Sequence, residues 1–412
     1  MSTQRELNQI KSVTLVDVQD AATRINDAIL RTPCPPSPAL SDLTGSSIFC
    51  KLEYLQRTGS FKERGARNAL LLLSPEQRLT GVIAASAGNH ALGLSWHGRS
   101  LSIPVTVVMP KSAPITKIAN CRKHNARVLL HGNDIQEARE LALRIVKEEG
   151  LTYINGFNDA AIIAGQGTIA LELIEQVPQF NAIILPVGGG GLAAGIALVL
   201  KSIRPDVRII AAQPGRVGSL KAAMETGSPI PNRIEKTLAD GLAVPVLGER
   251  AWSILAPLID EWVEVGEKEI ALAILKLIEL EKAVVEGAGA VPLAALLTGK
   301  LSHLKNQTVV LPLCGGNIDT TTLGRVIERG LAADGRLGRI TCTISDRPGG
   351  LAEFALVVAV AEGSIIQIEH DRAFASDDLS KVTIHCLVES RDQAHLTEIE
   401  AALRKSGFSP EQ

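Results

Sequence analysis

Four consecutive glycines at positions 188–191 are the feature of this chain that points most directly to chemistry. They follow the apolar run Ala182–Val187 and precede a helical pattern that is rich in small residues and starts at Leu192. Only glycine lets several backbone amides turn toward one point without an obstructing side chain, and a helix N-terminus behind them adds positive potential. The pattern predicts a phosphate-binding loop. A tight strand-to-helix turn without a ligand is the alternative.

The residues around the glycines limit which phosphate-containing ligand could bind. A nucleotide P-loop needs lysine and then serine or threonine after its last glycine, but Leu192–Ala194 follow here. The dinucleotide fingerprint fits only loosely, so an adenosine nucleotide is not expected. Residues 182–200 carry no charge and are nearly long enough to cross a membrane, but Pro186 and the glycines would break that helix. A buried strand followed by a packed helix fits better.

A lysine and a second polar turn supply further reactive groups. Lys62 could form a Schiff base with an aldehyde as the neutral amine and later act as a base, although a lone lysine is more often a surface charge. The turn Ser86–His90 directly follows an apolar strand pattern at 82–85, and loops at the carboxyl ends of parallel strands converge on one crevice. Lysine, carboxylate-binding turn and phosphate loop together predict pyridoxal phosphate and an amino acid substrate.

Composition sets the class of protein. The chain has 412 residues, 46% of them hydrophobic, which is enough for two or three domains with full cores. A formal net charge of −2 argues against nucleic acid and anionic membranes as partners and favours small metabolites. Segment Met1–Leu7 lacks the pattern of a signal or transit peptide, and the six cysteines are scattered singly. We therefore expect a cytoplasmic enzyme with free thiols.

Short β-branched runs alternate with helical patterns along the first 330 residues. Such alternation predicts an α/β fold with parallel sheets flanked by helices. The expected strands are 81–85, 104–109, 126–130, 182–187, 207–212 and 308–313, and the clearest helices are 134–149 and 267–282.

A second domain is predicted after a glycine-containing linker at 331–338. Its pattern is βαββα: strands at 340–344, 364–369 and 381–388, and helices at 351–361 and 391–405. A final strand is expected to be short or absent, because only residues 408–412 follow Gly407. The domains are therefore expected at 1–330 and 339–412.

The ordered motifs identify a family. The chain resembles the fold-type II pyridoxal phosphate enzymes, which are similar to the tryptophan synthase β chain, and most closely resembles the threonine dehydratases (threonine ammonia-lyases) with a C-terminal ACT-like domain. The resemblance covers about residues 15–330 and implies two α/β subdomains, the smaller at about 52–156. It rests on seven segments: Gly59–Lys62, Ser86–His90, Ala164–Thr168, Val187–Leu192, Ala239–Gly241, Glu286–Ala290 and Cys314–Asn317.

The resemblance implies roles for individual residues. Lys62 would form the Schiff base with pyridoxal phosphate and act as the catalytic base. The other cofactor-binding residues would be Phe61 on the ring, Asn89 at the ring hydroxyl, Cys314 at the pyridine nitrogen, Gly188, Gly189, Gly190, Gly191 and Leu192 at the phosphate, and Asn158 and Glu286 in support. The substrate-binding residues would be Ser86, Ala87, Gly88, Asn89 and His90.

The implied reaction is elimination of ammonia from L-threonine to give 2-oxobutanoate, with L-serine giving pyruvate as a side activity. A near-neutral thiol at Cys314 cannot keep the pyridine nitrogen protonated as a carboxylate does, which favours elimination over a long-lived carbanion. An ordinary buried thiol is the alternative for this cysteine.

Two departures from related activities are visible. Serine racemases of this family carry a second serine where Ala87 stands, and alanine cannot protonate the opposite face of Cα. The same relatives place carboxylates as divalent-metal ligands where this chain has Gln213 and Ser219. Neutral ligands hold Mg²⁺ or Ca²⁺ less well, so no metal site is expected.

The C-terminal unit resembles an ACT domain through Asp346, Arg347, Pro348, Gly349, Gly350 and Leu351. In the family such domains pair side by side and bind amino acids. The resemblance therefore implies a homodimer or homotetramer regulated by a branched-chain amino acid such as isoleucine or valine.

Other functions on the same fold stay open. A serine racemase or hydroxyaspartate dehydratase, a β-replacing synthase and a non-catalytic amino acid sensor are the alternatives. The intact segment around Lys62 argues against the sensor, and the ACT-like tail favours a feedback-controlled dehydratase over a synthase.

Overall fold

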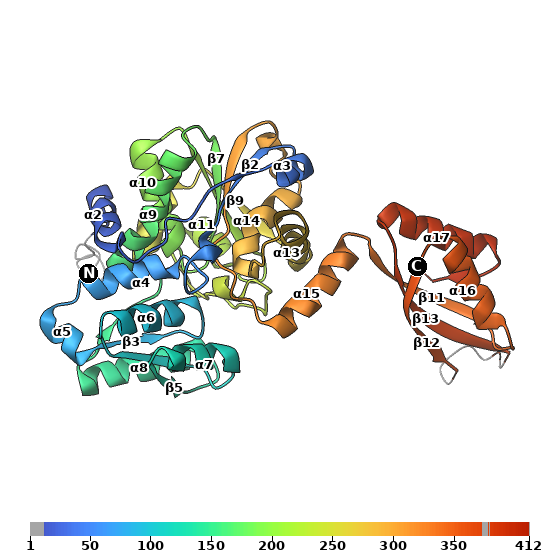
Figure 1. Ribbon diagram of the computed structural model, residues 1–412, viewed down its shortest axis with the longest axis horizontal. Helices are drawn as coiled ribbons and strands as arrows, with labels where there is room; N and C mark the ends of the chain where they lie inside the picture. The colour runs from blue at the N-terminus through green and yellow to red at the C-terminus, as the bar shows by residue number, and fades with distance from the viewer. Residues whose placement is uncertain (1–11, 373–377, 379, 412) are drawn as a thin grey trace. The chain divides into compact units, whose positions relative to one another are not determined.

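The computed structural model describes residues 12–372, 378 and 380–411 (Figure 1). The prediction for Met1–Leu7 lies outside the described residues. The chain divides into two compact units, Met1–Asp319 and Thr320–Gln412. This division precedes the expected linker at 331–338, most of which belongs to helix α15 (Thr320–Ala333) and strand β11 (Leu337–Ser345). Gly330 is a buried helical residue, so only residues 334–336 connect helix and strand.

The larger sheet of the first unit has six strands in the order β1-β2-β10-β7-β8-β9. All neighbouring strands are parallel except β1 and β2. The central strand β7 is buried along its whole length and is apolar without alternation, as expected for a strand covered on both faces. The strands are β1 (Pro36–Ser37), β2 (Ser47–Lys51), β7 (Ala182–Pro186), β8 (Arg208–Pro214), β9 (Glu261–Val265) and β10 (Thr308–Pro312).

A smaller parallel sheet has the order β5-β4-β3-β6 and lies within the segment 52–156 expected to form a subdomain. Its strands are β3 (Val82–Ala85), β4 (Val105–Met109), β5 (Arg127–Leu130) and β6 (Thr152–Tyr153). The connecting helices are α6 (Asn89–Ser100), α7 (Ile115–Lys123) and α8 (Ile135–Glu149). Helix α8 begins where the Asp134 side chain accepts a hydrogen bond from the Glu137 amide and ends at Gly150, which has a φ of 69°.

Most of the remaining helices of the first unit lie around the larger sheet or between the two sheets, and α5 lies beside the smaller sheet (Figure 1). They are α2 (Leu15–Ile25), α3 (Pro38–Thr44), α4 (Lys62–Leu71), α5 (Pro75–Thr80), α9 (Ala160–Gln176), α10 (Gly191–Ile203), α11 (Ser219–Thr226), α12 (Glu249–Leu255), α13 (Glu267–Glu281) and α14 (Gly287–Leu297). Short 3₁₀ turns lie at η1 (Glu53–Leu55), η2 (Asp240–Leu242), η3 (Ala256–Leu258) and η4 (Ser302–Leu304).

Helices α4, α9 and α10 approach one another unusually closely. A Cβ added to Gly165 on α9 would lie 2.6 Å from the Cα of Gly65 on α4. A Cβ added to Gly195 on α10 would lie 2.7 Å from the amide nitrogen of Gly167 on α9. The helix that begins at Lys62 and the helix that follows the glycine loop therefore pack against opposite sides of α9 with no room for side chains.

The second unit contains a four-stranded antiparallel sheet in the order β12-β13-β11-β14. Its further elements are α16 (Gly350–Val360), β12 (Ser364–Asp371), β13 (Lys381–Glu389), α17 (Gln393–Lys405) and β14 (Ser409–Pro410). Alternate residues of β11 and β13 are buried together with apolar residues of the two helices. The final strand exists but has only two residues, paired with Cys342 and Thr343. The arrangement is the ferredoxin-like α+β fold.

Across the described ranges, no helix is both apolar enough and long enough to span a bilayer.

The close packing of α9 leads to a stability prediction. Gly165→Ala should lower the free energy of unfolding by about 1–3 kcal/mol, because its methyl group would overlap the α4 backbone. Gly93→Ala on α6 is the matched control: its added carbon would meet nothing closer than 3.4 Å, so stability should change by less than about 1 kcal/mol. Denaturant unfolding measures both changes. Equal stabilities of the two variants would contradict the packing argument.

Candidate active site

Helix α4 begins at Lys62, and its first turn directs this side chain toward the loop after β6. The Nζ atom donates a hydrogen bond to the carbonyl oxygen of Gly156 at 2.7 Å. Burial lowers the pKa of Lys62 to about 8, and the negative charge of nearby Glu286 limits this decrease. The amine is therefore neutral in a useful fraction of molecules near neutral pH, as a nucleophile or base must be.

The glycine loop forms an anion-binding helix terminus. Gly190 is the N-cap of α10 with a φ of 90°, a conformation that residues with a Cβ rarely adopt. A Cβ at Gly189 would lie 2.2 Å from Cγ of Phe157, and one at Gly191 would lie 2.3 Å from the Phe157 carbonyl oxygen. Since no side chain caps this helix, its first amide groups are available to a ligand. Leu192 is buried in the first turn behind them.

The loop 155–158 joins the lysine to the glycine loop. Its Gly156 accepts the bond from Lys62, and the next residue, Phe157, packs against the glycines. The Asn155 side chain holds the loop by accepting hydrogen bonds from the amides of Phe157 and Asn158 at 3.0 and 2.9 Å. Sequence analysis missed Gly156 and Phe157. Their position just after a strand of the smaller sheet, beside the turn that follows β3, was the available signal.

The turn 86–90 ends at an uncapped helix N-terminus. Gly88 is the N-cap of α6 and supplies no side-chain acceptor, so the first amides of this helix can bind a carboxylate. The Ser86 hydroxyl accepts a hydrogen bond from the Gly88 amide at 3.3 Å, and Ala87 packs against the core of the smaller subdomain.

His90 is buried beside the lysine. Its Nε2 lies 3.2 Å from the carbonyl oxygen of Ile154, and its Nδ1 has no partner among the described residues. Burial, reinforced by the positive charge of Lys62, lowers the pKa of His90 to about 3, so its ring is neutral. A Cβ at Gly156 would lie 2.8 Å from its Cγ, which places the ring against the same loop that receives Lys62.

A chain of amides links the turn to a buried carboxyl group. Asn89 donates a hydrogen bond to Glu286 at 2.7 Å, and Asn317 donates to Asn89 at 2.8 Å and to the Thr58 carbonyl at 2.7 Å. Burial and the charge of Asp240 raise the pKa of Glu286 to about 7. Asn317 fixes the rotamer of Asn89 and was not among the predicted site residues.

Cys314 carries a neutral thiol. Burial raises the pKa of this thiol well above its ordinary value, and its Sγ donates to the carbonyl oxygen of Pro312 at 3.2 Å. The Phe61 amide donates to the Cys314 carbonyl at 3.0 Å, and Ser60 forms a bridge with Gly315. The cysteine thus lies at the start of the lysine segment, with Phe61 half-buried next to it.

Asn158 has a supporting contact of its own. Its side-chain oxygen accepts hydrogen bonds from the amides of Arg250 and Ala251 at 2.9 and 3.2 Å and so caps helix α12. The expected regulatory residues 346–351 belong to the second unit and are described separately from this site.

Pyridoxal phosphate fits these residues. A Cβ at Gly188, Gly189 or Gly191 would collide with Leu242 or Phe157, so only glycine permits this turn at the start of α10. Lys62 is half-buried, and the Ser60 hydroxyl is buried without a partner among the described residues. A neutral thiol suits an unprotonated pyridine nitrogen.

The two positions considered for a divalent metal are engaged with the protein. Gln213 donates hydrogen bonds to the Val187 carbonyl at 2.9 Å and to Ser219 at 3.2 Å, and it accepts one from the Leu220 amide at 2.7 Å. The described residues contain no cluster of three His, Cys, Asp or Glu side chains that could hold a metal ion.

The chain is similar to several known proteins. The L-threonine ammonia-lyase of Thermotoga maritima is 41% identical over 396 residues, which covers 96% of this chain and 98% of that protein. The processed form of threonine deaminase isoform 2 from Solanum lycopersicum matches with a TM-score of 0.73 and 36% identity over 76% of this chain and 92% of its own. Maize serine racemase matches with a TM-score of 0.73 and 32% identity, covering 78% and 98%.

The family described as "Pyridoxal-phosphate dependent enzyme" matches residues 25–315. These residues include Lys62, the turn 86–90, the glycine loop and Cys314. The chain belongs to the pyridoxal-phosphate-dependent enzyme family.

Proposed function

We propose that the protein converts L-threonine to 2-oxobutanoate and ammonia with pyridoxal phosphate, and L-serine to pyruvate as a side activity. The observation that carries this proposal is the half-buried Lys62, held by a loop that also packs on the glycine loop. The near-full-length similarity to a protein named L-threonine ammonia-lyase supports this choice of substrate.

The residues of the site divide the work. Gly188–Gly191 and Leu192 would hold the cofactor phosphate through backbone amides, and Lys62 would attach to its aldehyde. When bound, the cofactor supplies an electron sink for charge that develops at the substrate Cα. The amides that begin α6, with Ser86 and Asn89, orient the substrate carboxylate so that the Cα proton faces Lys62. Lys62, released when the substrate amine takes its place on the aldehyde, would then remove this proton as the free amine.

The surroundings favour elimination. Cys314 is uncharged, so it does not stabilise a proton on the pyridine nitrogen. His90 is neutral, so it is not a second cation beside Lys62. Ala87 carries no transferable proton for the second face of Cα, which supports a lyase over a racemase. Because the chain is also similar to maize serine racemase, D-serine must be included among the substrates tested.

The C-terminal unit supports a regulatory proposal. We propose that residues 339–412, within this unit, form an ACT-like domain that binds a branched-chain amino acid between β11 and α16. Gly349 has a φ of 92° and caps α16, and a Cβ at Gly350 would lie 2.3 Å from the carbonyl oxygen of Ser345. These two glycines therefore permit the tight turn from β11 into α16, beside which the effector would bind. Arg372 holds Asp346 at 2.9 Å beside this turn.

We further propose that the enzyme is cytoplasmic and a homodimer or homotetramer. All six cysteines are buried free thiols, which suits a reducing compartment.

The substrate prediction is direct. Purified protein should release oxo acid and ammonia from L-threonine, more slowly from L-serine, and little from D-serine or 3-hydroxyaspartate. Lys62→Ala should lower kcat for threonine by about 10²–10⁴-fold, because both attachment and base are lost. Lys62→Arg, which keeps the cation but cannot become neutral, should be equally impaired. Failure to form oxo acid from any of the four compounds would refute the lyase.

The lysine's acidity predicts how cofactor incorporation depends on pH. In apo protein, covalent incorporation of pyridoxal phosphate needs the neutral amine, so its rate should rise with pH and level off above about 8. Glu286→Gln should move the profile to lower pH, because the carboxylate favours the ammonium form. Stopped-flow absorbance measures both profiles. A wild-type profile that levels near 10.5, the ordinary lysine value, would contradict the buried amine.

The hydrogen-bonded Gln213 predicts independence of divalent metal. Treatment with a chelator should leave the rate with threonine and the unfolding temperature unchanged, because neutral oxygens at Gln213 and Ser219 bind Mg²⁺ or Ca²⁺ poorly. Gln213→Glu provides the comparison, since it restores a carboxylate ligand. Restoration of lost activity in the wild type by added Mg²⁺ would overturn this expectation.

A further inference from the structure

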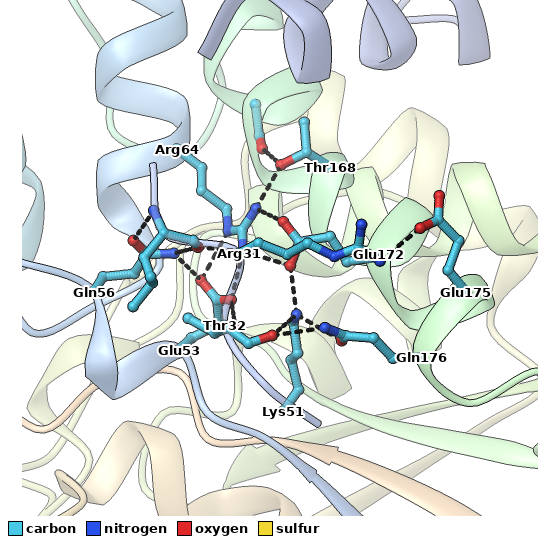
Figure 2. A network of polar contacts seen from close by, with 12 residues as sticks. Arg31, Thr32, Lys51, Glu53, Gln56, Arg64, Thr168, Glu172, Glu175 and Gln176 are labelled. Atoms are coloured by element: carbon cyan, nitrogen blue, oxygen red, sulfur yellow. Dashed lines mark hydrogen bonds and ion pairs between the residues drawn. The ribbon is translucent and has the colours of Figure 1, made fainter. Parts of the chain in front are cut away.

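A buried network of charges surrounds Arg64, two residues after the lysine (Figure 2). It contains two cations, Arg64 and Lys51, and two carboxylates, Glu53 and Glu172. Arg64, Lys51 and Glu53 are at most 1% exposed. The two positive and two negative groups balance, and they come from β2, η1, α4 and α9. Lys51, Glu53 and Arg64 are close in sequence, whereas Glu172 lies 108 residues after Arg64.

Arg64 is the centre of this network. Its guanidinium donates two hydrogen bonds to the carboxylate of Glu53 at 2.8 and 2.7 Å. It donates two more to Glu172 at 2.6 and 3.0 Å, and one to the hydroxyl of Thr168 at 3.1 Å. All three of its nitrogens are therefore used, and two planar carboxylates fix its orientation.

Stability alone does not account for this arrangement. A cation in the first turn of a helix opposes the helix dipole, and the charges of the network lose hydration on burial. Replacing such a buried set by apolar residues is often neutral or stabilising. Unlike apolar packing, a bidentate guanidinium also fixes the orientation of the groups that it binds.

The first turn of α4 shows which side chains Arg64 could orient. Successive helical residues are rotated by about 100°, so residues 62, 63 and 64 face three ways. Lys62 faces Gly156, and Glu63 accepts from the Thr58 amide and lies 3.3 Å from Nε2 of His97. Arg64 faces α9, whose other side packs on the helix that follows the glycine loop.

We propose that Arg64 is a positioning residue for the reaction. By binding Glu53 on one side and Thr168 and Glu172 of α9 on the other, it fixes the rotation of the first turn of α4 relative to the glycine loop. This rotation sets where the amine of Lys62 stands. The inference rests on the proposed role of Lys62 and assigns Arg64 no contact with substrate or cofactor.

Arg64→Lys is the decisive variant, because it keeps the charge and removes the planar fork. Lys51→Met is its matched control: Lys51 binds Glu172, Gln176 and the Thr32 carbonyl in the same network, and these hydrogen bonds do not include a residue of α4. Arg31→Gln, which breaks the exposed pair with Glu175 in Figure 2, is the surface control.

Each variant is compared in three measurements: unfolding temperature of the apo protein, retention of pyridoxal phosphate with its rate of trapping by borohydride, and kcat and KM for threonine. Arg64→Lys should lower kcat by about 10–10²-fold with KM changed by less than about threefold, and should slow trapping, since misplacement by about 1 Å is costly. Lys51→Met should lower the unfolding temperature similarly and keep kcat within about threefold of wild type.

Equal losses of kcat in Arg64→Lys and Lys51→Met, or wild-type kcat and trapping in Arg64→Lys, would overturn the proposal. If Arg64→Lys does not fold, Glu53→Gln removes one of the two carboxylates that orient the guanidinium and must show the same selective loss. A wild-type protein that retains the cofactor but does not act on threonine would refute the proposed function only, because cofactor retention and trapping still test positioning.

Discussion

The structure depends on keeping one amine partly out of water. Burial lowers the pKa of Lys62, while the carboxylate of Glu286 opposes the decrease, so the amine stays near the point where both its forms are available. A fully buried lysine without such neighbours would become a much weaker base, and an exposed one would remain protonated. The surrounding helices, loops and carbonyl groups are arranged to maintain this intermediate condition.

The second constraint is the distance between Lys62 and the glycine loop, which is set by close backbone packing of three helices. The lysine begins α4, the glycine loop begins α10, and α9 separates them with glycines on both faces. Because Gly165 meets Gly65 and Gly167 meets Gly195, these helices approach nearly at backbone contact and have little freedom to slide. The loop 155–158 then closes the remaining gap, since Gly156 contacts the lysine and Phe157 contacts the glycines.

Sequence reasoning succeeded where the signal was local. The glycine loop and the turn 86–90 could be predicted because backbone chemistry at strand ends depends on neighbours in sequence, and six expected strands are present within two residues of their predicted ends. Strand β2 was missed because it ends at Lys51, whose burial depends on Glu172, 121 residues away. The role of Arg64 could not be predicted for the same reason, and residues 331–333 were assigned to the linker although they complete helix α15.

The neutral character of the site connects these points to the type of reaction. His90 is uncharged, Cys314 holds its proton, and Glu286 titrates near neutrality while bound to Asn89. A strong permanent acid beside the ring would hold charge on a carbanion and give it time to be protonated from another direction. Without such an acid, and with alanine at position 87, charge formed at Cα is released most readily by loss of the neighbouring leaving group. The absence of a permanent acid beside the cofactor would therefore shorten the time that charge stays at Cα, while partial burial keeps Lys62 able to accept a proton.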